Sequence, residues 1–308
     1  MIIINRQFSG LYAIVLTPFK SDGSVDFSAL EKYLDCAVHS KSLKGLVMCG
    51  STSEFTRMTF EENMDVIKIA KSVNGGVKQL VCGITAGDTY TSLKYASDVQ
   101  KLGADAFLLA PSYYFKLSDS EIYENYKTIL TEYSDIPFIG YNIPQCTNAV
   151  SLSVFEKLLE FENLKGFKNS WNDMQEITAG ISLRNKKRED VSMFTGLDAC
   201  LYGTLALGGD GIFSAITYLM PEIIDFIYEN FGKNDLSFEC QCDLIELINL
   251  VNQFTFPLGY RVLSDALGMY LGEGRESIPQ SIKNMADAAK NEMKKIYQNL
   301  ISKYSIEK

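Results

Sequence analysis

Short apolar runs alternate with longer amphipathic segments along most of this chain. Such brief runs, bounded by Gly, Pro, Ser or Asp, are typical of parallel strands that are buried on both faces. Eight of them occupy residues 12–16, 45–49, 79–83, 106–110, 138–141, 164–167, 191–194 and 211–213. The pattern therefore predicts eight buried strands in the first 220 residues.

The segments between these runs carry apolar residues at helical spacing. One helical face is formed by Leu30, Tyr33, Leu34, Ala37 and Val38. Helices are expected to begin after residues whose side chains cap a helix N-terminus, namely Asp26, Thr59, Asp88, Ser118 and Ser151. Eight units of strand and helix predict an α/β fold that closes into a (β/α)8 or TIM barrel.

An open, doubly wound sheet is the alternative to a barrel. Such a sheet more often shows a glycine fingerprint after its first strand, where this chain has Thr17-Pro18-Phe19. No clear strand pattern follows residue 220. Helical patterns begin at Pro221 and cover residues 238–254, 257–271 and 279–304. We expect a barrel of residues 1–220 and a C-terminal helical extension of residues 221–308 packed on it as one structural unit.

Composition narrows the classes of partner and the cellular location. The net charge of −9 over 308 residues argues against nucleic acid, because a nucleic-acid binder needs a basic face. No apolar run approaches the roughly 20 residues that span a bilayer, and the apolar start at residues 1–6 is too short for a signal peptide. Seven cysteines without a C-x-x-C pair predict free thiols and a cytoplasmic protein.

The presence of a single histidine, His39, limits the chemistry. A Ser-His-Asp triad could use only this residue, and a metal site with several histidines is impossible. We therefore expect no metal, and an active site built mostly from Lys, Tyr, Ser, Thr, Asp, Glu or Cys.

In a barrel, ligands meet the carboxyl ends of the strands. Polar side chains follow the predicted strands at Thr17, Ser51, Thr52, Ser53, Glu54, Tyr113, Tyr114, Tyr141, Lys168, Asp198 and Ser214. Lys168 ends an apolar strand, so its stem is expected to be buried and its ammonium desolvated. Desolvation favours the neutral amine, which can attack a ketone and form a Schiff base. The alternative for Lys168 is a surface lysine at a strand end.

The stretch from Gly50 to Ser53 suits a carboxylate, because hydroxyls and successive backbone N–H groups of a tight loop bind anions. The alternative is a capped turn, and in isolation the tyrosines could be packed aromatics. Glu54 could cap the following helix, bind an effector or do neither, and we expect a local role. Asp198 could bind a substrate hydroxyl or cap a helix.

Together these motifs resemble one family. Its order and spacing are matched by Thr17-Pro18-Phe19, Gly50-Ser51-Thr52-Ser53-Glu54, Tyr113-Tyr114, Tyr141-Asn142-Ile143-Pro144, Gly166-Phe167-Lys168, Asp198 and Leu207-Gly208-Gly209-Asp210-Gly211. Over nearly its whole length the chain is similar to the dihydrodipicolinate synthase / N-acetylneuraminate lyase family. The resemblance implies a Schiff-base (class I) aldolase without a metal or organic cofactor, built as a homotetramer of two dimers.

The resemblance also implies residue roles. Lys168 would condense with pyruvate or another 2-oxo acid, whose carboxylate Ser51 and Thr52 would hold. Thr52 would also link the tyrosines. Tyr141 would relay the proton of the reacting oxygen, and Tyr114 would reach into the site of a neighbouring subunit.

Three departures from the family pattern bear on the substrate. Cys146 stands where the synthases carry an arginine for aspartate semialdehyde, and Ala199 follows Asp198 where sialate lyases have Asp-Glu. Ser53 replaces a glycine and would strain the loop if that position required a positive φ. We expect pyruvate and an aldehyde as substrates, in a 2-keto-3-deoxy acid or N-acetylneuraminate type of lyase, with Asp198, Ser214 and Cys146 as further contacts.

Three other functions are weighed against this one. The first is 4-hydroxy-tetrahydrodipicolinate synthesis from pyruvate and aspartate semialdehyde, and the second is a non-catalytic sensor of 2-oxo acids. The third is a phosphate-handling barrel, suggested by the glycine-rich residues 208–211. That loop precedes the predicted eighth strand and so lies at the wrong end of a barrel for a ligand.

Overall fold

The computed structural model describes residues 6–307. Its eight strands are β1 (Gly10–Ile14), β2 (Gly45–Met48), β3 (Gln79–Gly83), β4 (Ala106–Leu109), β5 (Phe138–Asn142), β6 (Leu164–Asn169), β7 (Ser192–Thr195) and β8 (Gly211–Ser214). They follow one another in this order and close into a barrel. The predicted TIM barrel is confirmed, and the open sheet is excluded.

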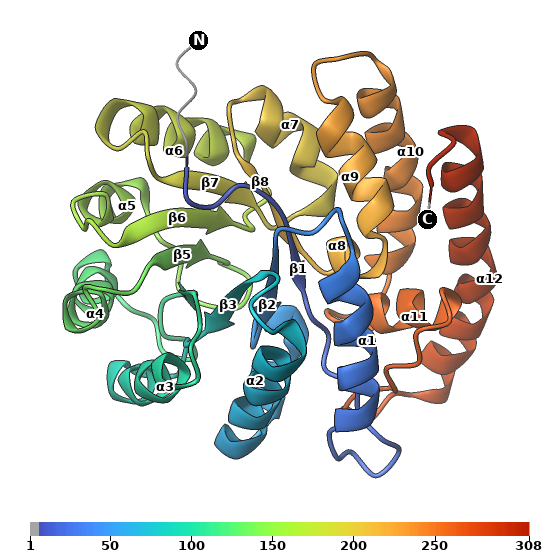
Figure 1. Ribbon diagram of the computed structural model, residues 1–308, viewed down its shortest axis with the longest axis horizontal. Helices are drawn as coiled ribbons and strands as arrows, with labels where there is room; N and C mark the ends of the chain where they lie inside the picture. Colours follow the sequence, from blue (N-terminus) through green and yellow to red (C-terminus); the bar gives the residue numbers. More distant parts are fainter. Residues whose placement is uncertain (1–5, 308) are drawn as a thin grey trace. The chain divides into compact units, whose positions relative to one another are not determined.

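Helices alternate with the strands and then continue to the C-terminus (Figure 1). They are α1 (Phe27–His39), α2 (Phe60–Asn74), α3 (Thr89–Lys101), α4 (Asp119–Glu132), α5 (Leu152–Leu158), α6 (Met174–Lys187), α7 (Leu201–Ala206), α8 (Ile216–Leu219), α9 (Pro221–Asn230), α10 (Leu236–Val251), α11 (Leu258–Ala266) and α12 (Gln280–Lys303). Three short 3₁₀ helices are η1 (Ser51–Ser53), η2 (Phe55–Arg57) and η3 (Asp198–Cys200). The chain divides into two compact units. One contains the residues up to 10 together with residues 79–213, and the other contains residues 11–78 together with those from 214 onward.

All five predicted helix starts are confirmed, because each residue is an N-cap whose side chain accepts a backbone N–H of the first turn. They are Asp26, Thr59, Asp88, Ser118 and Ser151. At Thr59 and Ser118, the side chain of the glutamate three residues later accepts a hydrogen bond from the backbone N–H of the cap residue, which completes a capping box. The predicted face of residues 30–38 is also the buried face of α1.

In the unit that contains residues 79–213, helices α3 to α6 lie along the outer side of strands β3 to β7 (Figure 1). The strands are parallel, and their register sets Tyr141 of β5 beside Lys168 of β6. Phe107 of β4 packs edge-on against Phe138 and Tyr133, with ring centroids 5.3 and 5.7 Å away. Aromatic packing thus joins β4 to β5, the strand that carries Tyr141.

In the other unit, α1 packs on α2, and α10 packs on α9, α11 and α12. The predicted helix over 257–271 is too long, because α11 ends at Ala266. Gly268, Gly272 and Gly274 have φ values of 83°, 74° and 87°, a left-handed backbone that ends helices and favours glycine. Residues 267–279 therefore form an irregular connection to α12, called the strap below.

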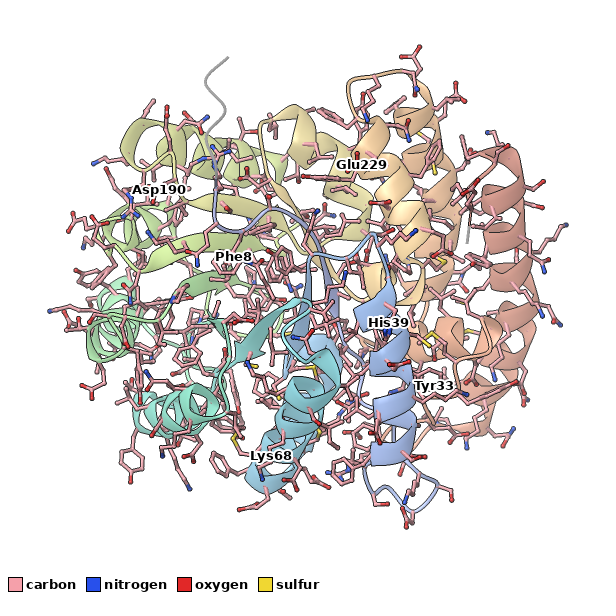
Figure 2. The ribbon with its side chains drawn as sticks, in the orientation of Figure 1. Phe8, Tyr33, His39, Lys68, Asp190 and Glu229 are labelled. Carbon is pink, nitrogen blue, oxygen red and sulfur yellow. The ribbon has the colours of Figure 1, made fainter. Side chains whose placement is uncertain are left out.

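His39 ends α1 on the surface (Figure 2), with a side chain that is 74% exposed. Its Nδ1 lies 2.8 Å from the backbone oxygen of Asp35, so no buried triad is built on it. The seven cysteines are free thiols. None of the helices within residues 6–307 has the length and hydropathy needed to cross a bilayer. The start of the chain, which bears on a signal peptide, lies outside the described residues.

The glycine-rich loop before β8 has a structural role. The Asp210 carboxylate accepts hydrogen bonds from Arg6 (2.8 Å), from the N–H of Met193 (2.7 Å) and from Arg184 (3.3 Å). Arg184 is 1% exposed and also donates to the oxygen of Gly208 at 2.7 Å. Asp210 therefore holds the amino ends of β7 and β8 together, and these contacts give no support to a phosphate site.

Asp210→Asn is expected to lower the free energy of unfolding by about 3–5 kcal/mol, because it leaves the buried Arg184 without its counter-charge. The control is Asp190→Asn, which breaks the more exposed pair of Asp190 with Arg188 and is expected to cost at most about 1 kcal/mol. Urea unfolding at neutral pH measures both. Equal losses in the two variants would contradict the assigned role of Asp210.

Candidate functional site

Lys168 lies in β6 with its side chain turned into the interior. It is 1% exposed, which excludes the alternative of a surface lysine. Its Nζ lies 3.9 Å from the centroid of the Tyr141 ring. Because Tyr141 and Lys168 are register partners on neighbouring strands, the backbone itself sets this contact. A buried primary amine therefore faces a phenol.

Two further residues complete this cluster. The Ser170 hydroxyl donates to the Tyr141 hydroxyl at 3.3 Å. Gly196, in the loop after β7, leaves the necessary room, because a Cβ there would lie 1.9 Å from Ser170 Oγ and 2.5 Å from Lys168 Cε. Tyr141, Lys168, Ser170 and Gly196 thus form one compact group.

Neither Ser170 nor Gly196 was assigned a role from the sequence. Ser170 follows Lys168 by two residues, the spacing that puts side chains on the same face of a strand, and this signal could have identified it. The need for Gly196 comes from side chains on a different strand. Only the folded chain reveals it.

Cys146 lies near this cluster, in the turn after β5. The residue is exposed, and its N–H donates to the oxygen of Ile143 at 2.9 Å. Desolvation raises the pKa of the thiol, and the charge of Lys168 opposes that rise. The neighbouring Gln145 donates to the backbone oxygen of Ser170 at 3.2 Å. The turn after β5 is therefore held against the chain after β6.

Asp198 and Tyr114 lie in loops after β7 and β4. Asp198 is buried and begins η3, and its charge adds to the desolvation that raises the pKa of the Cys200 thiol. Tyr114 has φ of 80° and is 92% exposed, with its ring centroid 5.1 Å from that of Phe115. A left-handed backbone is unusual for so bulky a residue.

The predicted carboxylate loop, residues 50–54, belongs to the other compact unit. Thr52 and Ser53 are both buried residues of η1. The Ser53 hydroxyl donates to the oxygen of Val15 at 2.6 Å, and the Thr17 hydroxyl donates to the oxygen of Ser53 at 2.8 Å. The strain considered for Ser53 does not arise, because the positive φ values fall on Cys49 (55°) and Glu54 (61°).

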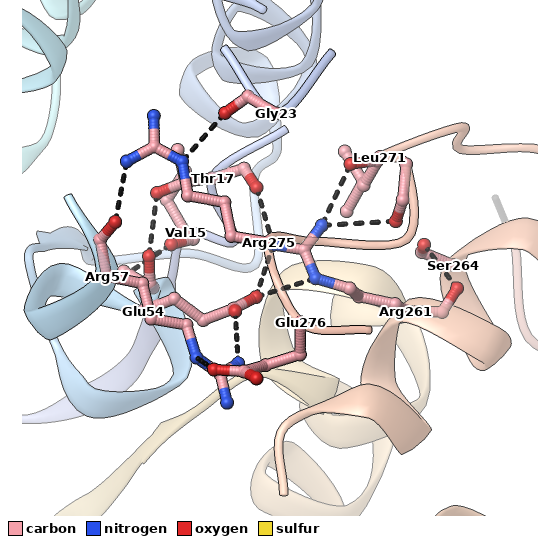
Figure 3. Close-up of polar contacts among 12 residues, drawn as sticks. Val15, Thr17, Gly23, Glu54, Arg57, Arg261, Ser264, Leu271, Arg275 and Glu276 are labelled. Carbon is pink, nitrogen blue, oxygen red and sulfur yellow. Dashed lines mark hydrogen bonds and ion pairs between the residues drawn. The ribbon is translucent and has the colours of Figure 1, made fainter. Parts of the chain in front are cut away.

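The structure gives Glu54 one local partner, Arg57, and one distant partner, Arg261. Thr59 caps the following helix, whereas the buried Glu54 carboxylate pairs with Arg57 and with Arg261 of α11, 207 residues away (Figure 3). Ser214 lies in the same unit, and its hydroxyl is 2.8 Å from that of Thr217 and accepts the Thr217 N–H. Its contacts are those of a residue that starts α8.

Among residues 6–307, no three His, Cys, Asp or Glu side chains gather in an arrangement that could hold a metal. The chemical resources of the site are thus an amine, phenols, hydroxyls, a thiol and a carboxylate. Of these groups, a primary amine can form an imine with a carbonyl compound, and a phenol can carry a proton.

The sequence of this chain is similar to those of known proteins. A family model described as the dihydrodipicolinate synthetase family matches residues 7–299. An uncharacterized DapA-like lyase of Thermococcus onnurineus is 32% identical over 225 residues, covering 73% of this chain and 76% of that protein. The 4-hydroxy-tetrahydrodipicolinate synthase of Archaeoglobus fulgidus is 27% identical over 293 residues, covering 94% and 99% of the two chains.

Solved structures give the same grouping. A 2-keto 3-deoxygluconate aldolase from Picrophilus torridus has a TM-score of 0.80 at 27% identity, over 88% of this chain and 97% of that one. Dihydrodipicolinate synthase from Aquifex aeolicus has a TM-score of 0.82 at 27% identity, over 97% and 99%. The protein is thus a pyruvate-dependent lyase or aldolase of class I. The chain belongs to the dihydrodipicolinate synthetase family.

Proposed function

We propose that this protein forms a Schiff base between Lys168 and the C2 carbonyl of pyruvate, and that it cleaves or forms a carbon–carbon bond of a 2-keto-3-deoxy acid. The observation that supports this most is the burial of Lys168 with its Nζ 3.9 Å from the Tyr141 ring centroid. A primary amine shielded from water beside a phenol has the groups that imine formation needs: a nucleophile and a proton carrier.

The proposed reaction uses neither a metal nor an organic cofactor, because the protonated imine takes up the electrons of the broken bond. The neutral amine attacks C2 of the substrate, and the resulting carbinolamine loses water to give a protonated imine. As that water leaves, the Tyr141 phenol gives it a proton and becomes a phenolate. In cleavage, this phenolate takes the proton of the C4 hydroxyl, the C3–C4 bond breaks, and its electrons move toward the imine nitrogen. The aldehyde leaves, the enamine takes a proton at C3, and water releases pyruvate. Ser170, which donates to the Tyr141 hydroxyl, orients the phenol.

The carboxylate of the 2-oxo acid is assigned to Ser51 and Thr52. These residues follow β2, and in a parallel barrel the loops after the strands are the ones that bind ligands. A 3₁₀ turn presents hydroxyls and successive N–H groups, which suit one carboxylate. Thr52 also links the hydroxyls of the tyrosines in this proposal, and Asp198 and Ser214 contact the remainder of the substrate.

Tyr114 is assigned to the site of a second copy of the chain. Its exposure of 92% and its φ of 80° support a residue held outward, and Phe115 and Tyr90 are also exposed, at 70% and 80%. Large exposed aromatics are typical of surfaces that are buried in an assembly. We propose a homotetramer built from two dimers, in a cytoplasmic location where the seven thiols stay reduced.

A 2-keto-3-deoxy sugar acid is the favoured substrate, and the Picrophilus aldolase is the neighbour whose name supports it. Cys146 lies near Lys168 and offers a thiol instead of a guanidinium, so it provides no charge-assisted fork for a second carboxylate. Condensation with aspartate semialdehyde is the second candidate, supported by the synthase of Archaeoglobus fulgidus.

Incubation with pyruvate and borohydride is expected to add one reduced pyruvyl group to the peptide that contains Lys168, as read by mass spectrometry. Lys168→Met is expected to show no adduct, because the nucleophile is gone. Lys165→Met, on the same strand, serves as the control and is expected to label like the wild type. No adduct on the wild type at saturating pyruvate would exclude the mechanism.

Tyr141→Phe is expected to lower kcat by about 100-fold or more, the usual contribution of a general acid–base group, with little change in the KM for the 2-oxo acid. Tyr133→Phe is the control, because that phenol donates to the backbone oxygen of Leu93 at 3.2 Å. Steady-state kinetics of pyruvate release measures both. Equal kcat values for Tyr141→Phe and the wild type would remove Tyr141 from the proton relay.

A panel of substrates separates the remaining functions. Pyruvate release is expected from 2-keto-3-deoxy sugar acids, with a larger kcat/KM than for N-acetylneuraminate cleavage or for condensation with aspartate semialdehyde. An adduct on Lys168 without turnover of any member would instead indicate a sensor. Greater activity with aspartate semialdehyde would indicate a synthase.

A further inference from the structure

The Glu54 carboxylate lies at the end of the loop that carries Ser51 and Thr52, and it is removed from water. Glu54 and Arg261 are each 3% exposed. One carboxylate oxygen accepts from Arg261 Nε at 2.6 Å, and the other accepts from Arg57 Nη1 (Figure 3). A buried carboxylate keeps its charge only with such partners, so its position depends on the two guanidiniums.

Arg261 joins three separate segments. Besides Glu54, its Nη2 donates to the backbone oxygen of Thr17 at 2.8 Å, and its Nη1 donates to that of Leu271 at 2.8 Å. The chain after β1, the loop after β2 and the strap are therefore held by one planar group. A guanidinium fixes such contacts because its donors have a rigid fork geometry, which an ammonium lacks.

The strap covers this pair. Gly274 has φ of 87°, and a Cβ there would lie 3.3 Å from Arg261 Nε and 3.4 Å from Glu54 Oε2. The backbone thus passes close above both charged groups. Arg275 fastens the strap further, with bonds to the backbone oxygens of Gly23 (2.7 Å) and Arg57 (2.6 Å) and to Glu62.

The loop needs this hold because its backbone is strained. Cys49 and Glu54, on either side of Gly50–Ser53, both have positive φ. Such a conformation in residues other than glycine persists only where surrounding contacts enforce it. The Thr17 hydroxyl fixes the oxygen of Ser53, and Arg261 fixes both the oxygen of Thr17 and the side chain of Glu54.

We propose that Arg261 is a positioning residue for 2-oxo acid binding. By holding Glu54 and Thr17, it sets the direction in which Ser51 and Thr52 present their hydroxyl and N–H groups to the substrate carboxylate. The proposal rests on the function proposed above. It assigns to the C-terminal helical segment a part in substrate affinity, although Arg261 itself touches no substrate.

The test measures borohydride trapping at Lys168 as a function of ketone concentration. Arg261→Met is expected to raise the half-saturating pyruvate concentration about tenfold or more, the size of a lost hydrogen bond to a charged group. Arg261→Lys is expected to recover part of this loss. Trapping with acetone, which lacks the carboxylate, is expected to stay within about twofold of the wild type, because the chemical step at the amine is unchanged.

Arg184→Met is the matched control, because Arg184 is an equally buried arginine paired with an aspartate outside the site. Its thermal midpoint is expected to fall while the half-saturating pyruvate concentration stays constant. Should Arg261→Met fail to fold, the double variant Arg261→Met/Glu54→Gln removes both buried charges and is expected to show the same loss for pyruvate. An unchanged half-saturating pyruvate concentration in the Arg261 variants would overturn only the positioning role of Arg261. The absence of an adduct on the wild type would overturn the proposed function as well.

Discussion

The burial of one primary amine constrains the structure around it. A lysine that is 1% exposed has no access to bulk water, so the strands on either side must supply its surroundings. Tyr141 of β5 lies beside the lysine because the two residues are register partners. Gly196, in the loop after β7, has no side chain that would overlap with the lysine. The same packing that stabilises a parallel strand thus encloses the amine to which we assign Schiff-base formation.

Buried arginine–carboxylate pairs occur in each of the two compact units, with different consequences. Arg184 and Asp210 secure the amino ends of β7 and β8, and we assign them to stability. Arg261 and Glu54 lie behind the loop that follows β2, on the side of the strands from which ligands are bound. The same kind of buried ion pair therefore stabilises the barrel strands in one unit and positions the proposed substrate loop in the other.

The proposed substrate loop also shows how a departure from the expected family pattern can be accommodated. Ser53, for which the family resemblance implies a glycine, has a hydroxyl that donates to the backbone oxygen of Val15. The left-handed backbone falls on its neighbours Cys49 and Glu54, so the serine adds a contact without adding strain. The substitution is consequently compatible with the geometry of a carboxylate-binding turn.

Local pattern alone determined the eight strands, the five capped helix starts, the barrel and Lys168 as the candidate nucleophile. Each depends on side chains close together in sequence: strand periodicity, a cap and its first turn, or an amine at the end of an apolar run. Only the tertiary structure decided the bond between Ser170 and Tyr141, the need for Gly196 and the pairing of Glu54 with Arg261. These depend on groups up to 207 residues apart, and no local periodicity encodes which distant side chain will share a buried volume or a buried charge.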